Sequence, residues 1–118
     1  MIVNHLIEIR SITLKPGTRE EFHRLYIEKA LPLLKRWNFD VVAYGPSLHD
    51  ENSYYVIRRF DSLAQREQME EAYYSSDDWR QGPREAILAL MENRFARILC
   101  LSWMRSPCRG CVGSRKKW

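Results

Sequence analysis

The chain has 118 residues and a mass of 14.1 kDa, with 45% hydrophobic and 29% charged residues, which predicts one globular domain rather than two. Its longest apolar run is the six residues from Ala86 to Met91, whereas a membrane-spanning helix needs about 20, so the sequence excludes a helical membrane span. The net charge of +4 comes from residues 104–118, which hold five basic side chains and no acidic one. The rest of the chain has 14 basic and 15 acidic side chains, which argues against a nucleic-acid-binding surface on the domain. We therefore expect a domain over residues 1–103 and a basic, disordered tail over residues 104–118.

The first half of the chain predicts a strand and a long helix. The strand covers about residues 3–14, and its side chains alternate between two faces. After a turn at residues 15–17, apolar residues recur every three or four positions from Phe22 to Trp37, which is typical of an amphipathic helix. Thr18 and Glu21 fit a capping box at the start of this helix, and Pro32 should bend it.

The second half predicts two strands, two helical segments and a last strand. Strands over about residues 41–47 and 54–60 flank the polar loop 49–52 and should pair as a hairpin. Asp61 or Ser62 then caps a helix over about residues 63–74, and residues 75–78 break it before a short turn that carries Trp79. Pro83 starts a further helical segment, and the last strand covers about residues 94–103. This order predicts the α+β class: a ferredoxin-like βαββαβ subunit, with a four-stranded antiparallel sheet and helices on one face.

Helices on one side of a single sheet leave its other side bare. We assign to this bare side the face of the first strand that carries Leu6, Ile12 and Leu14 beside Glu8 and Arg10. Its mixture of apolar and charged side chains suits neither water nor an ordinary core. A second copy of the chain would cover it, sheet against sheet, and close a dimeric α+β barrel. The predicted partner is therefore the chain itself, as a homodimer.

The segment from Ile7 to Gly17 contains Glu8-x-Arg10 and, further on, Leu14-x-Pro16-Gly17. Together with residues 31–34, 41–46 and 77–80, it resembles the NIPSNAP family of the dimeric α+β barrel superfamily, whose signature is Glu-x-Arg-x-Tyr-x-Leu-x-Pro-Gly. Ile12 stands at the usual aromatic position. The resemblance covers about residues 3–101. It implies a ferredoxin-like subunit and a homodimer, but no settled reaction.

Glu8 and Arg10 are the first candidate site residues. They are two positions apart on a strand, so their side chains share a face. One interpretation is a buried ion pair that specifies the fold, with Arg58 of the third strand added. The other is an anion anchor, in which one arginine stays free to bind a carboxylate or enolate oxygen. The sequence leaves both open.

Aromatic residues and one histidine complete the candidates. Tyr44 and Tyr55 lie on the central hairpin and Trp79 at a helix break; such side chains line small-ligand pockets and also fill ordinary cores. We expect ligand-binding roles for Tyr55 and Trp79 beside Glu8, Arg10 and Arg58. His49 at the hairpin end and Tyr44 are the candidates for moving a proton, although a histidine in a surface loop is commonly a solvent-exposed residue without a role.

No cofactor or metal is expected. Cys108 and Cys111 have the spacing of half a zinc site, but no second Cys or His pair follows. The resemblance points to a superfamily whose haem-degrading members use a histidine on the second helix, and residues 61–92 contain none. Three cysteines, an odd number, and the absence of a secretory signal predict a reducing, cytoplasmic location.

The resulting hypothesis is a homodimeric, NIPSNAP-like α+β-barrel protein of unassigned activity that binds a small, partly apolar or anionic ligand. The alternatives are a cofactor-independent monooxygenase or isomerase of the same superfamily, and a non-enzymatic interaction scaffold. An interior filled with side chains favours the scaffold, whereas an open pocket with converging polar groups favours a ligand site.

Overall fold

The computed structural model describes residues 4–102. Its elements, in chain order, are β1 (Asn4–Leu14), α1 (Arg19–Leu25), the π-helical segment η1 (Tyr26–Ala30), α2 (Leu31–Arg36), β2 (Asp40–Pro46), β3 (Ser53–Phe60), α3 (Leu63–Tyr74), α4 (Asp77–Arg80), α5 (Arg84–Leu88) and β4 (Met91–Ser102). The four antiparallel strands lie in the order β2-β3-β1-β4, which confirms the ferredoxin-like prediction. The predicted tail, with Cys108 and Cys111, lies outside the described residues.

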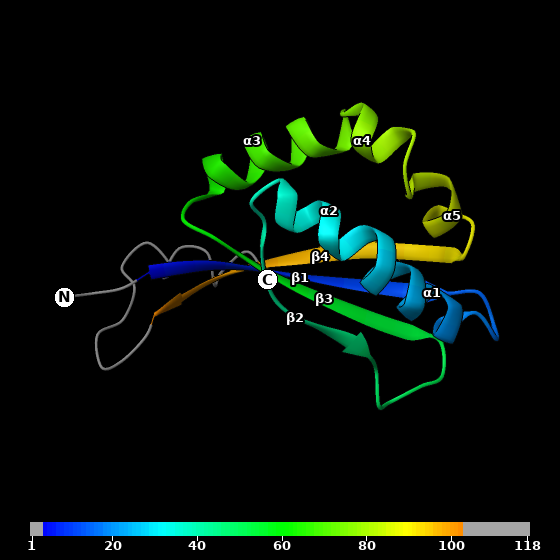
Figure 1. The fold of residues 1–118 in the computed structure, drawn as a ribbon. Coiled ribbons are helices and arrows are strands. Elements are labelled where there is room, and N and C mark those ends of the chain that lie inside the picture. Colours follow the sequence, from blue (N-terminus) through cyan, green and yellow to red (C-terminus); the bar gives the residue numbers. More distant parts are fainter. Residues whose placement is uncertain (1–3, 103–118) are drawn as a thin grey trace.

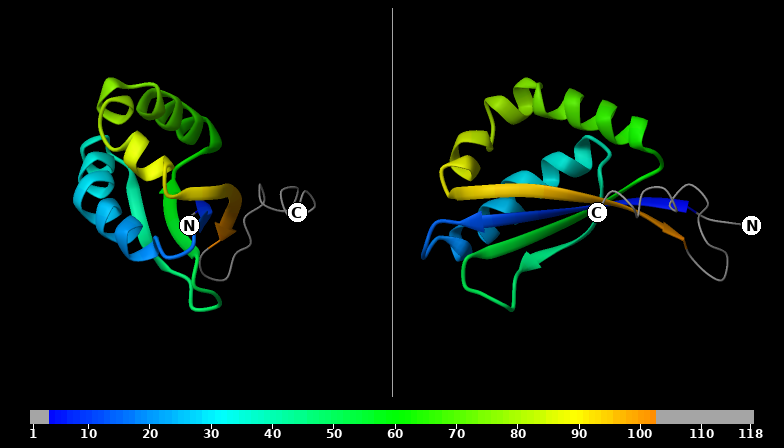
Figure 2. Two further views of the ribbon diagram at one scale, coloured as in Figure 1. Left: turned by 90° about the vertical axis from the view of Figure 1, so that its right-hand side faces the viewer. Right: turned by 180° about the vertical axis from the view of Figure 1, so that it is seen from behind.

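All helices cover one face of the sheet. Figure 1 shows α1 and α2 lying along the strands while α3, α4 and α5 arch above them, and Figure 2 shows the same single-sided cover from the edge of the sheet. Within the described residues, no helix combines the length and the apolar character that crossing a bilayer requires.

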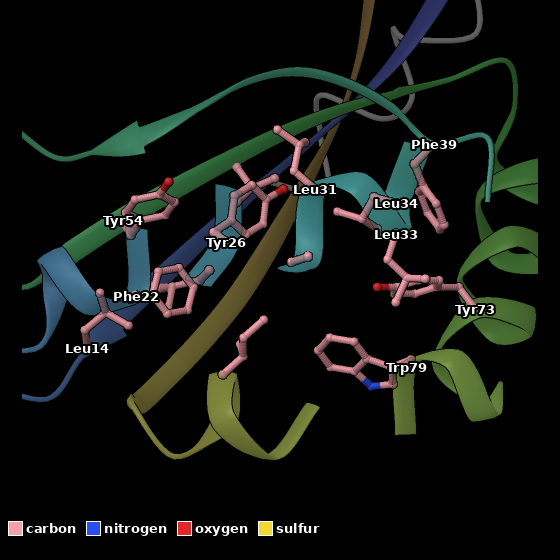
Figure 3. Close-up of a cluster of buried hydrophobic side chains, with 14 of the residues drawn as sticks. Leu14, Phe22, Tyr26, Leu31, Leu33, Leu34, Phe39, Tyr54, Tyr73 and Trp79 are labelled. Carbon is pink, nitrogen blue, oxygen red and sulfur yellow. The ribbon is translucent and has the colours of Figure 1, made fainter. Parts of the chain in front are cut away.

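The sheet face that the sequence assigned to the bare side is instead the face that the helices cover. Ile12 and Leu14 are 5% and 0% exposed and belong to the apolar core, where Phe22 of α1 also lies (Figure 3). Glu8 on the same face is also 0% exposed. The prediction was wrong because alternation shows which side chains share a face but not which face the helices will cover.

The uncovered face is the other one. Register places Ile9 between Ile57 and Arg97, and Ser11 between Tyr55 and Phe95, so apolar and aromatic side chains share the surface across β3, β1 and β4 with one arginine. Phe95 is 52% exposed and Tyr55 is 37% exposed. We call this surface, with its six residues, the outer sheet face, and no helix of the described part of the chain lies over it (Figure 2).

The first helix departs from its predicted local structure in two ways. Thr18 does not form the capping box. Its hydroxyl donates to the Lys15 carbonyl at 2.7 Å, so the side chain stabilises the preceding turn and does not cap the helix. The expected bend is a π-helical turn, in which the Leu31 N–H donates to the carbonyl of Tyr26. Pro32 is the second residue after this turn, and its missing N–H and its ring disfavour α-helical hydrogen bonding over the preceding residues.

The later helices follow their predicted signals. The Ser62 side chain accepts a hydrogen bond from the Gln65 N–H at 3.0 Å and starts α3, as one of the two predicted caps. Ser76 caps α4 in the same way through the N–H of Trp79. A Cβ at Gly82 would collide with the Asp78 carbonyl, so the tight turn from α4 to α5 depends on a glycine.

Candidate functional site

A cavity of about 410 Å³ lies between the sheet and the helices. Its walls come from β1, β3 and β4 below, from α1, η1 and α2 on one side, and from α3, α4 and α5 on the other. Phe22, Val56 and Ile87 supply apolar wall, whereas Arg10 and Arg58 supply charge. The volume is within the range of small-molecule sites, and the interior is therefore open rather than filled.

An ion network lies at the inner end of this cavity around the buried Glu8. Its carboxylate accepts from the Nε of Arg10 at 2.7 Å and from the Nε of Arg66 at 2.6 Å, and the Arg58 Nη1 lies 3.8 Å away. Glu70 of α3 joins it, because its carboxylate lies 2.9 Å from Arg10, 3.4 Å from Arg58 and 3.2 Å from Arg66. Three arginines thus share two carboxylates, and the predicted Glu8–Arg10 ion pair is one edge of a larger network.

The two glutamates of this network have opposite pKa shifts. Burial raises the pKa of Glu8, but a hydrogen bond with Glu70 and the charges of Arg10 and Arg58 outweigh it and lower the pKa to about 2. Burial raises the pKa of Glu70, and its hydrogen bond with Glu8 raises it further. Two adjacent carboxyl groups that share arginines therefore divide their roles: Glu8 holds the negative charge and Glu70 is the more easily protonated of the two.

Two buried tyrosine hydroxyls in the cavity wall make no hydrogen bond of good geometry within the described residues, although the Arg58 guanidinium lies close enough to the Tyr26 hydroxyl to act on its pKa. Tyr26 starts η1 and is 4% exposed, and Tyr73 in the last turn of α3 is 1% exposed. Both residues line the cavity, and Figure 3 shows the ring of Tyr73 near Trp79 with its hydroxyl toward the middle of the cluster, and the ring of Tyr26 across from it beside Leu31. The Nε of Arg58 is also buried and unpartnered. Orphaned buried donors are costly, so they indicate acceptors that a bound molecule would supply.

These phenols remain proton donors at physiological pH. Burial raises the pKa of Tyr26 to about 12, against the lowering effect of the Arg58 charge. Burial also raises the pKa of Tyr73, and the neighbouring Tyr74 adds to the shift. Tyr74 itself accepts a hydrogen bond from Arg58 at 2.9 Å, and the Arg10 guanidinium lies 5.2 Å from the centre of its ring.

Only part of the predicted residue set meets at the cavity. Arg10, Arg58 and Trp79 line it, and Glu8 lies directly behind the two arginines. Tyr55 lies on the outer sheet face, away from the cavity. The ligand-binding role of these residues stays a prediction.

The two candidates for proton transfer lie outside the cavity lining. His49 is exposed in the hairpin loop, where its backbone N–H donates to the Ser47 hydroxyl. Tyr44 is 39% exposed and packs its ring 5.4 Å from the ring of Tyr26. Tyr44 thus supports a cavity residue from behind, while His49 is remote from the ion network.

Sequence reasoning missed Glu70, Arg66 and the two orphaned tyrosines. Arg66 and Glu70 are four residues apart on α3, a spacing that predicts an ordinary surface ion pair, and nothing local shows that this helix face meets β1. Tyr26 fits the apolar stripe of its helix, so its pattern indicates core. Within residues 4–102 no group of three or more His, Cys, Asp or Glu side chains could hold a metal ion.

Comparisons with known proteins agree with this architecture. A family model described as NIPSNAP matches residues 7–102. A NIPSNAP family protein with unknown function from Agrobacterium tumefaciens str. C58 superposes with a TM-score of 0.78 at 20% identity, over 88% of this chain and 94% of that one. A NIPSNAP domain protein from Burkholderia xenovorans gives 0.73 at 17% identity, over 90% and 97% of the two chains.

A more distant neighbour carries an enzyme name. A putative antibiotic biosynthesis monooxygenase from Bordetella bronchiseptica has a TM-score of 0.62 at 17% identity, over 87% of this chain and 98% of that one. No curated protein matches the chain. At these identities the solved structures support the fold alone.

Proposed function

The chain belongs to the NIPSNAP family, and from this premise we propose that it binds a small, partly apolar, anionic organic ligand in the cavity between its helices and its sheet. The observation that carries the proposal is the pair of orphaned hydroxyls of Tyr26 and Tyr73 in the wall of an open 410 Å³ cavity. A core that had evolved only to be filled would pair or remove these groups.

Aromatic and cationic side chains around the cavity support this ligand class. The rings of Tyr73, Tyr74 and Trp79 lie within 6 Å of one another in edge-on or tilted pairs and form one apolar wall. The side chains that line the cavity include several arginines and, among the described residues, no aspartate or glutamate. An organic anion therefore suits both the wall and the electrostatics better than a neutral or cationic compound.

Mass spectrometry of the natively purified protein tests the proposal. Wild-type protein should release a small organic anion in near-stoichiometric amount. Ala30→Met, which extends a buried wall residue into the cavity, should abolish this retention, while the exposed Ala64→Met on α3 should not. Melting curves would verify that both variants fold. If wild type and Ala30→Met carry the same compounds, or neither carries any, the cavity is not the ligand site.

Ligand binding is preferred over turnover and over a scaffold role. The cavity is open, which favours a ligand site over an interaction scaffold, and within the described residues no histidine lines it to move protons. The monooxygenase name belongs to distant relatives of the fold, and no observation here assigns an oxygen-transfer step to this chain. A cofactor-independent reaction stays the alternative if the retained compound proves chemically altered after incubation.

We also propose that the protein is a homodimer, joined through the outer sheet face. Ile9, Ile57 and the half-exposed Phe95 give this face an apolar centre that a second copy would bury, and the family resemblance implies this pairing. Sedimentation should give about twice 14.1 kDa. Phe95→Glu should yield monomers, whereas the equally exposed Leu63→Glu on α3 should not. A wild-type monomer at micromolar concentration would refute the pairing.

The cellular location belongs to the same proposal. We propose the cytoplasm from the odd number of cysteines, while the disulfide bond of Cys100 in the structure counts against a reducing compartment.

A further inference from the structure

Three of the arginines that line the cavity are exposed to solvent. Arg80 ends α4, Arg84 begins α5 and Arg94 lies on β4, and each of them both lines the cavity and is exposed. We call them the mouth arginines. Within residues 4–102, none of them has an ion pair; the one side-chain contact among them is that of Arg94 with the Met91 sulfur at 3.9 Å. The mouth therefore carries positive charge without an internal counter-charge.

The inner end of the cavity is electrostatically different. There Arg10 and Arg58 already face Glu8 and Glu70 within 4 Å. An anionic group brought to this end would approach two carboxylates as well as the arginines, whereas at the mouth it would meet guanidinium groups alone. The two ends of the cavity thus differ: the inner arginines are paired with carboxylates, whereas the mouth arginines have no ion pair within the described residues.

The orphaned hydroxyls of Tyr26 and Tyr73 make this arrangement a binding site rather than a solvated cluster of arginines. They are buried, they lie in the same cavity, and they can donate to an oxygen of a molecule that enters from the mouth. The ring of Trp79, 5.6 Å from that of Tyr73, borders the same space. The two rings touch each other and form one aromatic surface, against which a flat aromatic body can pack.

We infer that the ligand is an aromatic compound with a dianionic head group, bound with its ring toward Trp79 and Tyr73 and its head group at the mouth arginines. This inference rests on the ligand binding proposed above and specifies its chemistry. Guanidinium groups present paired N–H donors, and three of them offer more donors than one carboxylate can accept. A phosphate monoester, with three terminal oxygens and close to two charges, is the simplest head group that would use all three.

A matched series of probes tests the charge of the head group. 2-Naphthyl phosphate, 2-naphthoate and 2-naphthol share the same naphthalene ring system. They carry about two, one and no negative charges at about pH 8. Calorimetric titration of the full-length protein at low ionic strength should rank them in that order of affinity. Added salt should weaken the phosphate most, because its binding depends on exposed charges.

Substitutions at the mouth test where the head group lies. Arg84→Gln, Arg80→Gln and Arg94→Gln should each weaken 2-naphthyl phosphate about tenfold, the usual worth of a charge-assisted hydrogen bond, and leave 2-naphthol unchanged. Arg24→Gln on α1 is the matched control: it removes the same charge from an exposed arginine outside the cavity lining, and should change neither affinity.

The outcomes separate this inference from the proposed function. If the three probes bind equally, or the mouth substitutions leave phosphate binding unchanged while Ala30→Met abolishes it, the cavity binds ligands and the dianionic head group is refuted. If none of the probes binds wild-type protein, the inference also fails, and ligand retention through purification then decides the proposed function by itself. If the mouth substitutions lower the affinity for 2-naphthyl phosphate tenfold, and neither 2-naphthol nor the Arg24→Gln control is affected, the dianionic head group at the mouth arginines is supported.

Discussion

The arginines at the two ends of the cavity have the same chemistry and opposite surroundings. At the inner end, the Arg10 and Arg58 side chains are 21% and 4% exposed and bonded to Glu8 and Glu70. At the mouth, Arg80 and its two neighbours are exposed and have no carboxylate partner within the described residues. The inner arginines thus stabilise the fold through their ion pairs, whereas the mouth arginines can bind the charged group of a ligand. Substitutions at the two ends should separate stability from binding.

The largest effect is expected from breaking the inner network at its centre. Glu8→Ala leaves Arg10, Arg58 and Arg66 facing a cavity without their shared carboxylate. Removing one partner of a buried ion pair typically costs about 3 to 5 kcal/mol, and chemical denaturation should show a loss of that size. Glu67→Ala, at an exposed position of the same helix as Arg66, should stay within about 0.5 kcal/mol. Equal small effects would mean that the network does not stabilise the fold.

Acid should weaken the same network in a defined pH range. The pKa of Glu8 is about 2 in the folded protein, against its ordinary 4.5. Because the folded pKa is the lower one, the stabilisation by Glu8 is complete above about pH 4.5 and is lost as the pH falls toward 2, a change of about 3 kcal/mol in the free energy of unfolding. Glu8→Gln should flatten this part of the stability curve. Identical curves for the two proteins would contradict the lowered pKa.

Glu70 should act in the opposite direction. Its pKa is raised in the folded protein, so its contribution is complete below the ordinary pKa and is lost as the pH rises through the folded value. Glu70→Gln should therefore lose less stability at neutral pH than Glu8→Gln. A larger loss for Glu70→Gln would reverse the assignment of the two carboxyl groups.

A smaller effect distinguishes the orphaned hydroxyls from a satisfied one. Tyr26→Phe and Tyr73→Phe remove buried donors without partners, so each should stabilise the ligand-free protein by about 1 kcal/mol and weaken ligand retention. Tyr54→Phe is the matched control, because the Tyr54 hydroxyl lies 2.7 Å from the Nδ1 of His23. This change should destabilise by about 1 kcal/mol. Thermal melts show whether each variant is more or less stable than wild type. A change in the same direction for all three would refute the distinction between orphaned and satisfied hydroxyls.

The smallest effect on stability is expected at the mouth. Arg84→Gln removes no ion pair recorded in the described residues, so its free energy of unfolding should stay within about 0.5 kcal/mol of wild type even where phosphate binding falls tenfold. Urea denaturation and calorimetric titration of the same sample provide both values. A loss of stability comparable to that of Glu8→Ala would erase the contrast between the two ends.

Much of the fold could be predicted because its signals are local. Ser62 and Ser76 cap helices through the N–H groups of residues three positions later, and the turn chemistry around Gly82 and Pro83 separates α4 from α5. The candidate site was less predictable. Arg10 and Arg58 were found because a charge on a half-apolar strand is conspicuous, whereas Tyr26 and Tyr73 look like ordinary core aromatics.

The sequence by itself determined the order of the elements and which residues share a strand face, since both depend on periods of two and of three to four residues. Only the tertiary structure decided which face the helices cover, because that choice depends on contacts between distant segments. Glu8 is bonded to an arginine 58 positions away, and Arg10 to a glutamate 60 positions away. The same long-range packing leaves the two tyrosine hydroxyls without partners and brings arginines from α4, α5 and β4 to one opening, and no local pattern encodes either result.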